Sequence, residues 1–160
     1  MPRSLAVQQS RVIPVSVDDA FAGTLPIPLT TIFSRWYGPI PPIAEVRGQQ
    51  GAWGTPGQTR DIAFKGVGGM HEELTSVDAP HSFGYRITGI TGPLGSLVGS
   101  AEGEWTFAPG STGATSTTVT WLWNIHAASA LTAALLPVVG LLWRGYARQS
   151  LATLSNELTR

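Results

Sequence analysis

Four polar residues have side chains that could bind a polar group or move protons: Arg60, Glu72, Tyr85 and His126. A guanidinium can polarise a carbonyl, and a carboxylate, a phenol or an imidazole can transfer a proton. Held around a reactive chain, such groups would support an aldol-type cyclisation or a dehydration. These four residues are therefore the candidate catalytic residues.

Arg60 and Glu72 lie on successive predicted strands, 59–65 and 70–77, on either side of a glycine-rich turn. A reversal near Val67 or Gly68 puts both side chains on one face of the sheet, close enough to pair diagonally. We favour a structural ion pair at the edge of the sheet or facing solvent. The alternative is a polar anchor for a ligand.

Tyr85 shares a predicted strand face with Phe83 and Ile87. Core packing with a satisfied hydroxyl is the simpler interpretation, and donation to a ligand carbonyl is the alternative. His126 ends the strand 117–126 and could be a general base at a pocket mouth, although an exposed histidine or a capped strand end is simpler. The three histidines lack ligand spacing, so we expect no metal and no cofactor.

Aromatic residues are concentrated on one face of the strand 117–126. Alternate side chains of a strand share a face, so Trp121 and Trp123 point one way and Asn124 and His126 the other. Two indoles on one strand face either fill a core or line a cavity. The other predicted ligand-binding residues come from several elements: Trp36, Tyr37, Trp53, Arg60, Phe64, Glu72, Tyr85, Ile87, Trp105, Val139 and Trp143.

A long helix should cover this aromatic face. Its apolar stripe recurs at helical spacing through Trp143, Ala147, Leu151, Leu154 and Leu158. The helix should begin near Pro137 or bend there, because proline lacks the backbone donor. The uncharged tract 127–143 approaches the roughly 17-residue minimum of a membrane span, but its proline and the preceding strand favour a capping helix. We expect no integral membrane association.

The remaining sequence predicts an antiparallel meander within a single domain at 11–158, preceded by a flexible segment at 1–10. A strand at 11–17 precedes two short helices, at 19–25, capped by Asp18, and at 29–37. The further strands are expected at 43–46, 59–65, 70–77, 83–90, 101–107 and 117–126, with a hairpin loop at 109–117.

The bulk composition excludes several classes of protein. A chain of 160 residues can bury its own core, and the lack of cysteine excludes disulfides and thiolate chemistry. Ten basic and ten acidic residues are scattered, so nucleic acid is not an expected partner. The N-terminus shows no signal peptide, and we expect a cytoplasmic monomer or weak homodimer.

Several stretches resemble a known family: LPIPLTTIF, GTPGQTRDI, HEELTSVDAPHSFGYRITGITGPLG, GEWTF, TVTWLWN and LLWRGYARQSLATLSNEL. Over residues 11–158 the chain is similar to the bacterial polyketide cyclase/dehydrase-like branch of the START-like, or SRPBCC, superfamily. The resemblance implies an α+β helix-grip fold. A curved antiparallel sheet of about six to seven strands would wrap around a long C-terminal helix, with two short helices after the first strand and a deep apolar cavity.

The expected function is binding of a hydrophobic small molecule, such as a lipid, a polyketide or an aromatic metabolite, between the sheet and the helix. One alternative is a cofactor-independent cyclase or dehydratase that uses the same cavity. Another is a module that contacts a protein or a membrane, which predicts an exposed apolar patch. The superfamily has no fixed catalytic signature, so the resemblance assigns no catalytic residue.

Overall fold

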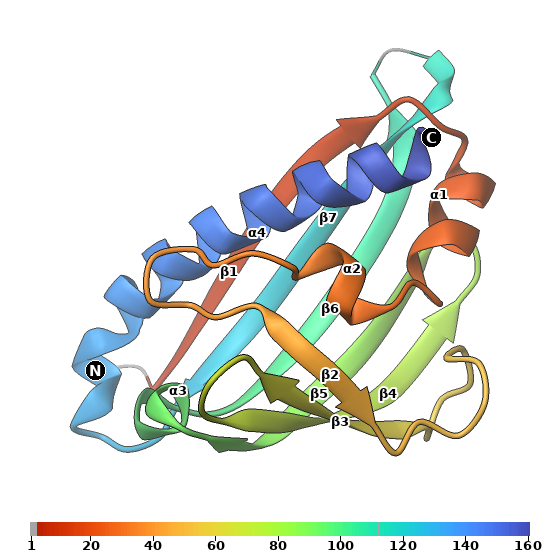
Figure 1. Cartoon of the computed structure of the whole chain (residues 1–160). Helices are drawn as coiled ribbons and strands as arrows, with labels where there is room; N and C mark the ends of the chain where they lie inside the picture. Colours follow the sequence, from red (N-terminus) through yellow and green to blue (C-terminus); the bar gives the residue numbers. More distant parts are fainter. Residues whose placement is uncertain (1–2, 112) are drawn as a thin grey trace.

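A curved, seven-stranded antiparallel sheet forms the body of the protein (Figure 1). The computed structural model describes residues 3–111 and 113–160. The strands are β1 (Ser4–Ile13), β2 (Ile43–Arg47), β3 (Thr59–Phe64), β4 (Gly69–Asp78), β5 (Ser82–Thr91), β6 (Val98–Gly110) and β7 (Gly113–Ala127). Their order, β1-β7-β6-β5-β4-β3-β2, confirms the predicted meander, with β1 added beside β7.

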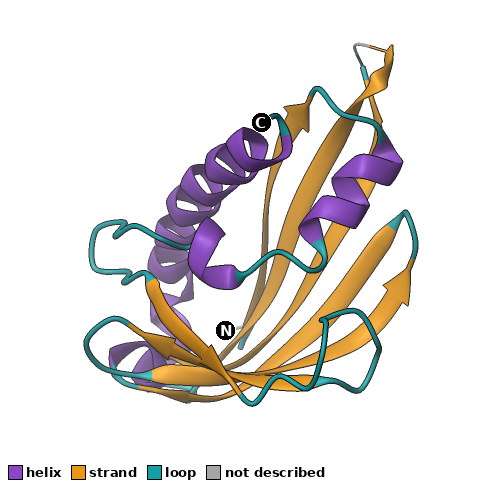
Figure 2. Ribbon diagram, turned by 45° about the vertical axis from the view of Figure 1, so that its right-hand side comes forward, coloured by secondary structure: helices purple, strands orange, loops and turns teal. Residues whose placement is uncertain are grey.

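The helices lie on the concave side of the sheet, and the longest is the last (Figure 2). They are α1 (Val17–Thr24), α2 (Leu29–Ile32), α3 (Pro93–Leu97) and α4 (Leu136–Leu158), and a 3₁₀ turn, η1 (Thr132–Leu135), leads into α4. The long C-terminal helix held against a curved sheet, with short helices after the first strand, is the expected helix-grip fold.

Helix α4 begins as the sequence predicted. Pro137 lies in its first turn, where a missing N–H removes no helical hydrogen bond. Gly140 lets the helix approach β1 closely, since a methyl group there would lie only 2.8 Å from the Leu5 side chain and 3.0 Å from that of Val7. None of the described helices has the length and apolarity needed to cross a membrane.

Helix α1 covers the other end of the sheet. Phe21 packs edge-on against Phe83 and Phe107, with ring centroids 6.0 and 5.4 Å apart. The N-cap of α1 is Ser16, whose hydroxyl accepts a hydrogen bond from the Asp19 amide at 3.1 Å. The prediction that Asp18 caps this helix was therefore wrong, and Asp18 lies in the first turn, where a carboxylate favours the helix dipole.

Strand β1 starts earlier than predicted. It pairs with β7 from Ser4, opposite His126, to Ile13, opposite Thr117. Residues 4–10 of the segment expected to be flexible therefore belong to the sheet, because the edge of β7 offers them a continuous set of backbone partners. Residues 1–2 lie outside the described residues.

Three other expectations need correction. Helix α2 ends at Ile32 instead of continuing to Tyr37, because the chain reverses at Gly38, which has a φ of +52°, and Tyr37 pairs with Ile40. Helix α3 was not predicted, since five residues give no helical period. Strands β6 and β7 extend into the predicted loop 109–117, of which residue 112 lies outside the described residues.

We predict that Leu154→Ala destabilises the fold by about 2–5 kcal/mol. The Leu154 side chain, on the inner face of α4, is fully buried, so its truncation leaves a cavity. Leu141→Ala on the same helix is the control. The Leu141 side chain is 68% exposed. The effect of its truncation should therefore stay within about 0.5 kcal/mol. Urea unfolding monitored by circular dichroism measures both, and equal losses would contradict the packing of α4 described above.

Candidate functional site

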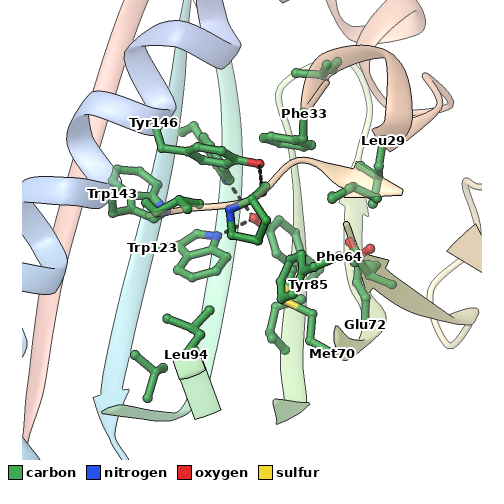
Figure 3. A pocket seen from close by; sticks show the side chains of 18 of the residues that line it. Leu29, Phe33, Phe64, Met70, Glu72, Tyr85, Leu94, Trp123, Trp143 and Tyr146 are labelled. Atoms are coloured by element: carbon green, nitrogen blue, oxygen red, sulfur yellow. Dashed lines mark hydrogen bonds between the residues drawn. The ribbon is translucent and has the colours of Figure 1, made fainter. Parts of the chain in front are cut away.

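A cavity of about 390 Å³ lies between the concave face of the sheet and helix α4 (Figure 3). Its wall is largely apolar and also includes the 33–41 segment, the β3–β4 turn and helix α3. Trp36 and Val67 belong to this wall and are 53% and 72% exposed, so they mark the mouth of the cavity. The cavity is therefore an apolar chamber open to solvent on one side.

The floor of the cavity depends on a contact across strand β6. Tyr85 on β5 faces Gly103 on β6, and Gly103 in turn faces Trp123 on β7. A methyl group at Gly103 would overlap the Tyr85 ring, so the ring lies across the strand where a side chain is missing. The Tyr85 hydroxyl thereby reaches β7 and accepts hydrogen bonds from the indole nitrogens of Trp121, at 2.7 Å, and Trp123.

This arrangement fixes the chemistry that Tyr85 can perform. Its oxygen accepts two N–H groups, which leaves the hydroxyl proton free to donate, and no described residue accepts it. Burial raises the pKa of the Tyr85 phenol above its usual value, so the group stays protonated. Tyr85 can donate a hydrogen bond but is a poor base.

Trp121 is held between two other indoles. Trp105 lies opposite it in the β6–β7 register and stacks on it with ring centroids 5.1 Å apart. Trp143 of α4 approaches it to 4.8 Å. Aromatic pairs of this kind add to the energy of burial and restrict ring motion. The helix is thus fixed to the sheet by an aromatic cluster that also forms one wall of the cavity.

A buried ion pair lies in the opposite wall. Arg60 and Glu72 face each other directly in the β3–β4 register, and the Arg60 Nε donates to the Glu72 Oε1 at 2.7 Å. Their side chains are only 5% and 6% exposed. The predicted pairing is thus present but directly opposed instead of diagonal. The alternative in which the pair faces solvent was wrong.

Two residues hold the Arg60 guanidinium in place. Trp53 stacks against it, with the Cζ atom 3.8 Å from the ring centroid, as in other cation–π contacts. The Gln49 side-chain oxygen accepts from Nη1 at 3.2 Å. The Glu72 Oε2 atom makes no hydrogen bond to a described residue. The pair therefore has a fixed cation and a carboxylate oxygen with acceptor capacity left for another molecule.

Burial sets the protonation behaviour of this pair. The loss of hydration raises the pKa of the Glu72 carboxyl, and the neighbouring Arg60 charge and hydrogen bond oppose that rise. A carboxyl with a raised pKa holds its proton more readily than an exposed carboxyl, which suits a group that takes up and releases a proton. Glu72 is accordingly the described cavity residue best suited to move a proton.

Most of the predicted ligand-binding residues meet in the cavity wall: Trp36, Arg60, Phe64, Glu72, Tyr85, Ile87, Trp105, Trp121, Trp123, Val139 and Trp143. Two do not line it, which corrects their predicted placement. Tyr37 packs against Gly145 of α4, and Trp53 stacks on Arg60.

His126 lies outside the cavity as well. Its Nε2 atom is 2.8 Å from the Glu102 Oε1, and both side chains are substantially exposed on the convex face. The simpler interpretation of His126, an exposed histidine at the end of a strand, therefore agrees with the structure, and the alternative that places it at a pocket mouth was wrong. The cause is strand alternation, which points His126 away from the face of Trp121 and Trp123.

Several residues of the wall were missing from the prediction. Ile62 and Met70 share strand faces with Arg60 and Glu72, so the period of two could have identified them. Leu94 and Leu97 come from the short helix α3, for which the sequence gives no periodic signal.

The sequence matches the family model described as "Polyketide cyclase / dehydrase and lipid transport" over residues 4–159. The chain belongs to this family. No curated protein sequence is significantly similar to it.

Several solved structures have a similar fold. Truncated norcoclaurine synthase from Thalictrum flavum is 16% identical with a TM-score of 0.68, covering 95% of this chain and 91% of that one. An uncharacterised protein from Bacillus thuringiensis is 15% identical with a TM-score of 0.66, covering 98% and 100%. Ara h 8.0201 is 14% identical with a TM-score of 0.63, covering 98% and 99%. At these identities the likeness concerns the fold alone.

For this member of the family, we predict that Tyr85→Phe lowers the free energy of unfolding by about 1–3 kcal/mol, because two buried indole N–H groups lose their acceptor. Tyr146→Phe is the matched control. The Tyr146 hydroxyl makes a single long bond, 3.4 Å to the Pro41 carbonyl. Its loss should therefore cost less than about 1 kcal/mol. Urea titration compares the two, and a larger loss for Tyr146→Phe would contradict the account of the cavity floor.

Proposed function

We propose that the protein binds a hydrophobic small molecule that has an apolar body and one polar group, and that the polar group contacts the Arg60–Glu72 pair. The observation that carries this proposal is an apolar cavity of about 390 Å³ with a buried ion pair in its wall. Pockets of roughly 300–1,000 Å³ suit small ligands, and a few polar groups among apolar walls orient the ligand.

The aromatic wall supports a ligand with a flat or extended apolar body. Trp121, Trp123 and Trp143 present large, rigid surfaces. Burial of a ligand against them contributes about 25 cal/mol for each Å² of apolar surface removed from water. The Tyr85 hydroxyl adds a donor with no acceptor among the described residues. A lipid, a polyketide or an aromatic metabolite has this combination of features.

The ion pair supports a function beyond folding. Two charges lose their hydration on burial, and replacement of such a pair by apolar residues is often neutral or stabilising. Arg60 is also held by Trp53 and Gln49 from outside the cavity, and the Glu72 Oε2 remains a hydrogen-bond acceptor. A polar ligand group provides the partner that this oxygen lacks.

We predict that Leu94→Trp reduces the affinity for the fluorescent probe 1-anilinonaphthalene-8-sulfonate by at least about tenfold, because the larger side chain occupies cavity space that the probe needs. Leu122→Trp is the matched control, since Leu122 lies on the convex face, away from the cavity. Fluorescence titration measures both. Equal affinities for the two variants would place the probe elsewhere on the protein.

The role of the ion pair is tested with 1-naphthol and naphthalene, which differ by one hydroxyl group. The protein should bind 1-naphthol about tenfold more tightly, because a hydrogen bond to a charged group contributes about 1.5–3 kcal/mol. R60M/E72L should remove this preference without lowering the melting temperature. A preference that survives in this variant would show that the pair does not contact the ligand.

A second candidate function is a cofactor-independent cyclase or dehydratase, and the raised pKa of the buried Glu72 favours it. The Glu72 carboxylate would take a proton from a carbon between two carbonyls. The resulting enolate would attack a third carbonyl to form a carbon–carbon bond, and the new alkoxide would take the proton back from Glu72 to become a hydroxyl group. Glu72 would then remove a second proton from the adjoining carbon and return it to the departing hydroxyl group, which releases water and leaves a carbon–carbon double bond. The Tyr85 hydroxyl would donate a hydrogen bond to a carbonyl oxygen as negative charge develops.

If this activity is present, incubation with a poly-β-ketone should give a cyclised product of lower mass through loss of water. The rate should rise with pH through the raised pKa of Glu72, since the base is the carboxylate form. Glu72→Gln should lower the rate by roughly 10²-fold or more. Mass spectrometry of timed samples gives the rates, and an unchanged rate in this variant would exclude Glu72 as the base.

A further inference from the structure

The loop that joins β2 to β3, residues 48–58, holds the cation of the buried ion pair (Figure 1). Trp53 stacks on the Arg60 guanidinium, and the Gln49 Oε1 accepts a hydrogen bond from its Nη1. Neither Gln49 nor Trp53 lines the cavity. Through Arg60 the loop therefore acts on a wall to which these two residues do not belong.

Most of this loop is exposed. Trp53 is 3% exposed, whereas Gly51, Ala52, Thr55 and Pro56 lie at the surface. Between β2 and β3 the described chain forms no helix or strand. An exposed segment without a backbone ladder needs other hydrogen bonds to keep one conformation.

The Gln58 side chain provides these hydrogen bonds. Its Oε1 atom accepts from the backbone N–H groups of Gly54, at 2.8 Å, and Thr55, at 2.7 Å. Its Nε2 atom donates to the carbonyls of Gln50 and Ala52, both at 2.9 Å. A primary amide has two acceptor lone pairs and two donor hydrogens, so Gln58 uses its full capacity on the loop.

Gln58 is itself anchored in the sheet. It directly precedes β3, and its carbonyl accepts a hydrogen bond at 2.9 Å from the N–H of Leu74, a fully buried residue of β4. Arg60 follows only two residues later. The segment 58–60 thus carries both the side chain that orders the loop and the cation that the loop holds.

The loop holds Arg60 in an incomplete pairing with Glu72. An arginine and a carboxylate frequently form two parallel hydrogen bonds. In the described structure one bond joins these two side chains, from the Arg60 Nε to the Glu72 Oε1. A guanidinium released from Trp53 and Gln49 would be free to turn and form the second bond, to the Glu72 Oε2.

We propose that Gln58 is a positioning residue: by ordering the loop, it keeps the Arg60 guanidinium from closing on the Glu72 Oε2. This oxygen then stays open to the polar group of a ligand. The role rests on the proposed function, in which that polar group contacts the ion pair. Gln58 does not line the cavity, so its effect is indirect.

Ligand preference gives the first test. Gln58→Ala should lower the preference for 1-naphthol over naphthalene from about tenfold to about threefold or less, because the Glu72 Oε2 becomes occupied by Arg60. The affinity for naphthalene, which contacts the apolar wall, should change by less than about twofold. In R60M/E72L the further change Gln58→Ala should have no effect on the preference, since both changes act through the same contact.

Two further variants separate positioning from a space-filling role. Gln58→Glu keeps the size and the acceptor but has no hydrogen to donate to the Gln50 and Ala52 carbonyls, so it should behave like Gln58→Ala. Gln50→Ala, in the same loop, is the matched control. The loop uses the Gln50 carbonyl and not its side chain, so this variant should keep the wild-type preference.

The side-chain Nε–H signal of Arg60 in ¹H–¹⁵N NMR spectra tests the position of the guanidinium without a ligand. The signal is identified by its loss in R60M/E72L. Gln58→Ala should shift it, since the Trp53 ring then no longer lies over the guanidinium, and Gln50→Ala should not.

The role of Gln58 is overturned if this signal is the same in Gln58→Ala and in the wild-type protein, or if Gln58→Glu behaves like the wild-type protein. A preference that stays tenfold in Gln58→Ala would also overturn it. A wild-type protein without any preference for 1-naphthol would instead count against the proposed function, and the Arg60 signal would still decide whether Gln58 positions the guanidinium.

Discussion

The hydrogen bonds from two tryptophan indoles to the Tyr85 hydroxyl are the interaction on which the cavity depends. They join β5 to β7 across β6, and they form only because Gly103 leaves space for the ring to lie on the sheet. With the indoles fixed, Trp121 can stack on Trp105 and contact Trp143 of α4. The helix is thereby held at a distance from β3 and β4, and the cavity is the space that remains.

The two ends of the cavity differ in chemistry. Near α4 the indole N–H groups of Trp121 and Trp123 bond the Tyr85 hydroxyl, so that part of the wall presents mainly rings, one phenolic proton and the buried Trp143 Nε1, which has no partner among the described residues. Near β3 and β4 the Arg60–Glu72 pair is buried, and its cost in hydration is offset only in part by mutual attraction. A ligand with an apolar body and one polar end matches this distribution. A carrier and a cyclase would both use it, since both must orient a mainly apolar molecule.

Sequence patterns predicted the sheet, the last helix and the pairing of Arg60 with Glu72, because strand alternation and a helical stripe are local signals. They did not predict helix α3, the early start of β1 or the location of Tyr37, since each depends on contacts with distant parts of the chain. The role of Gly103 was invisible for the same reason. The role of a glycine in a strand becomes clear only when the side chain that lies across it is known.

The central claim is that the cavity holds a hydrophobic molecule, and native mass spectrometry of the protein, purified without detergent, tests it most directly. Solvent extraction would then identify any bound compound. The account predicts a bound molecule of defined mass at one per chain, lost when Leu94→Trp fills the cavity and retained in Leu122→Trp. A bound mass that both variants retain equally would contradict the claim, and so would a protein that stays free of ligand after incubation with lipid and aromatic extracts.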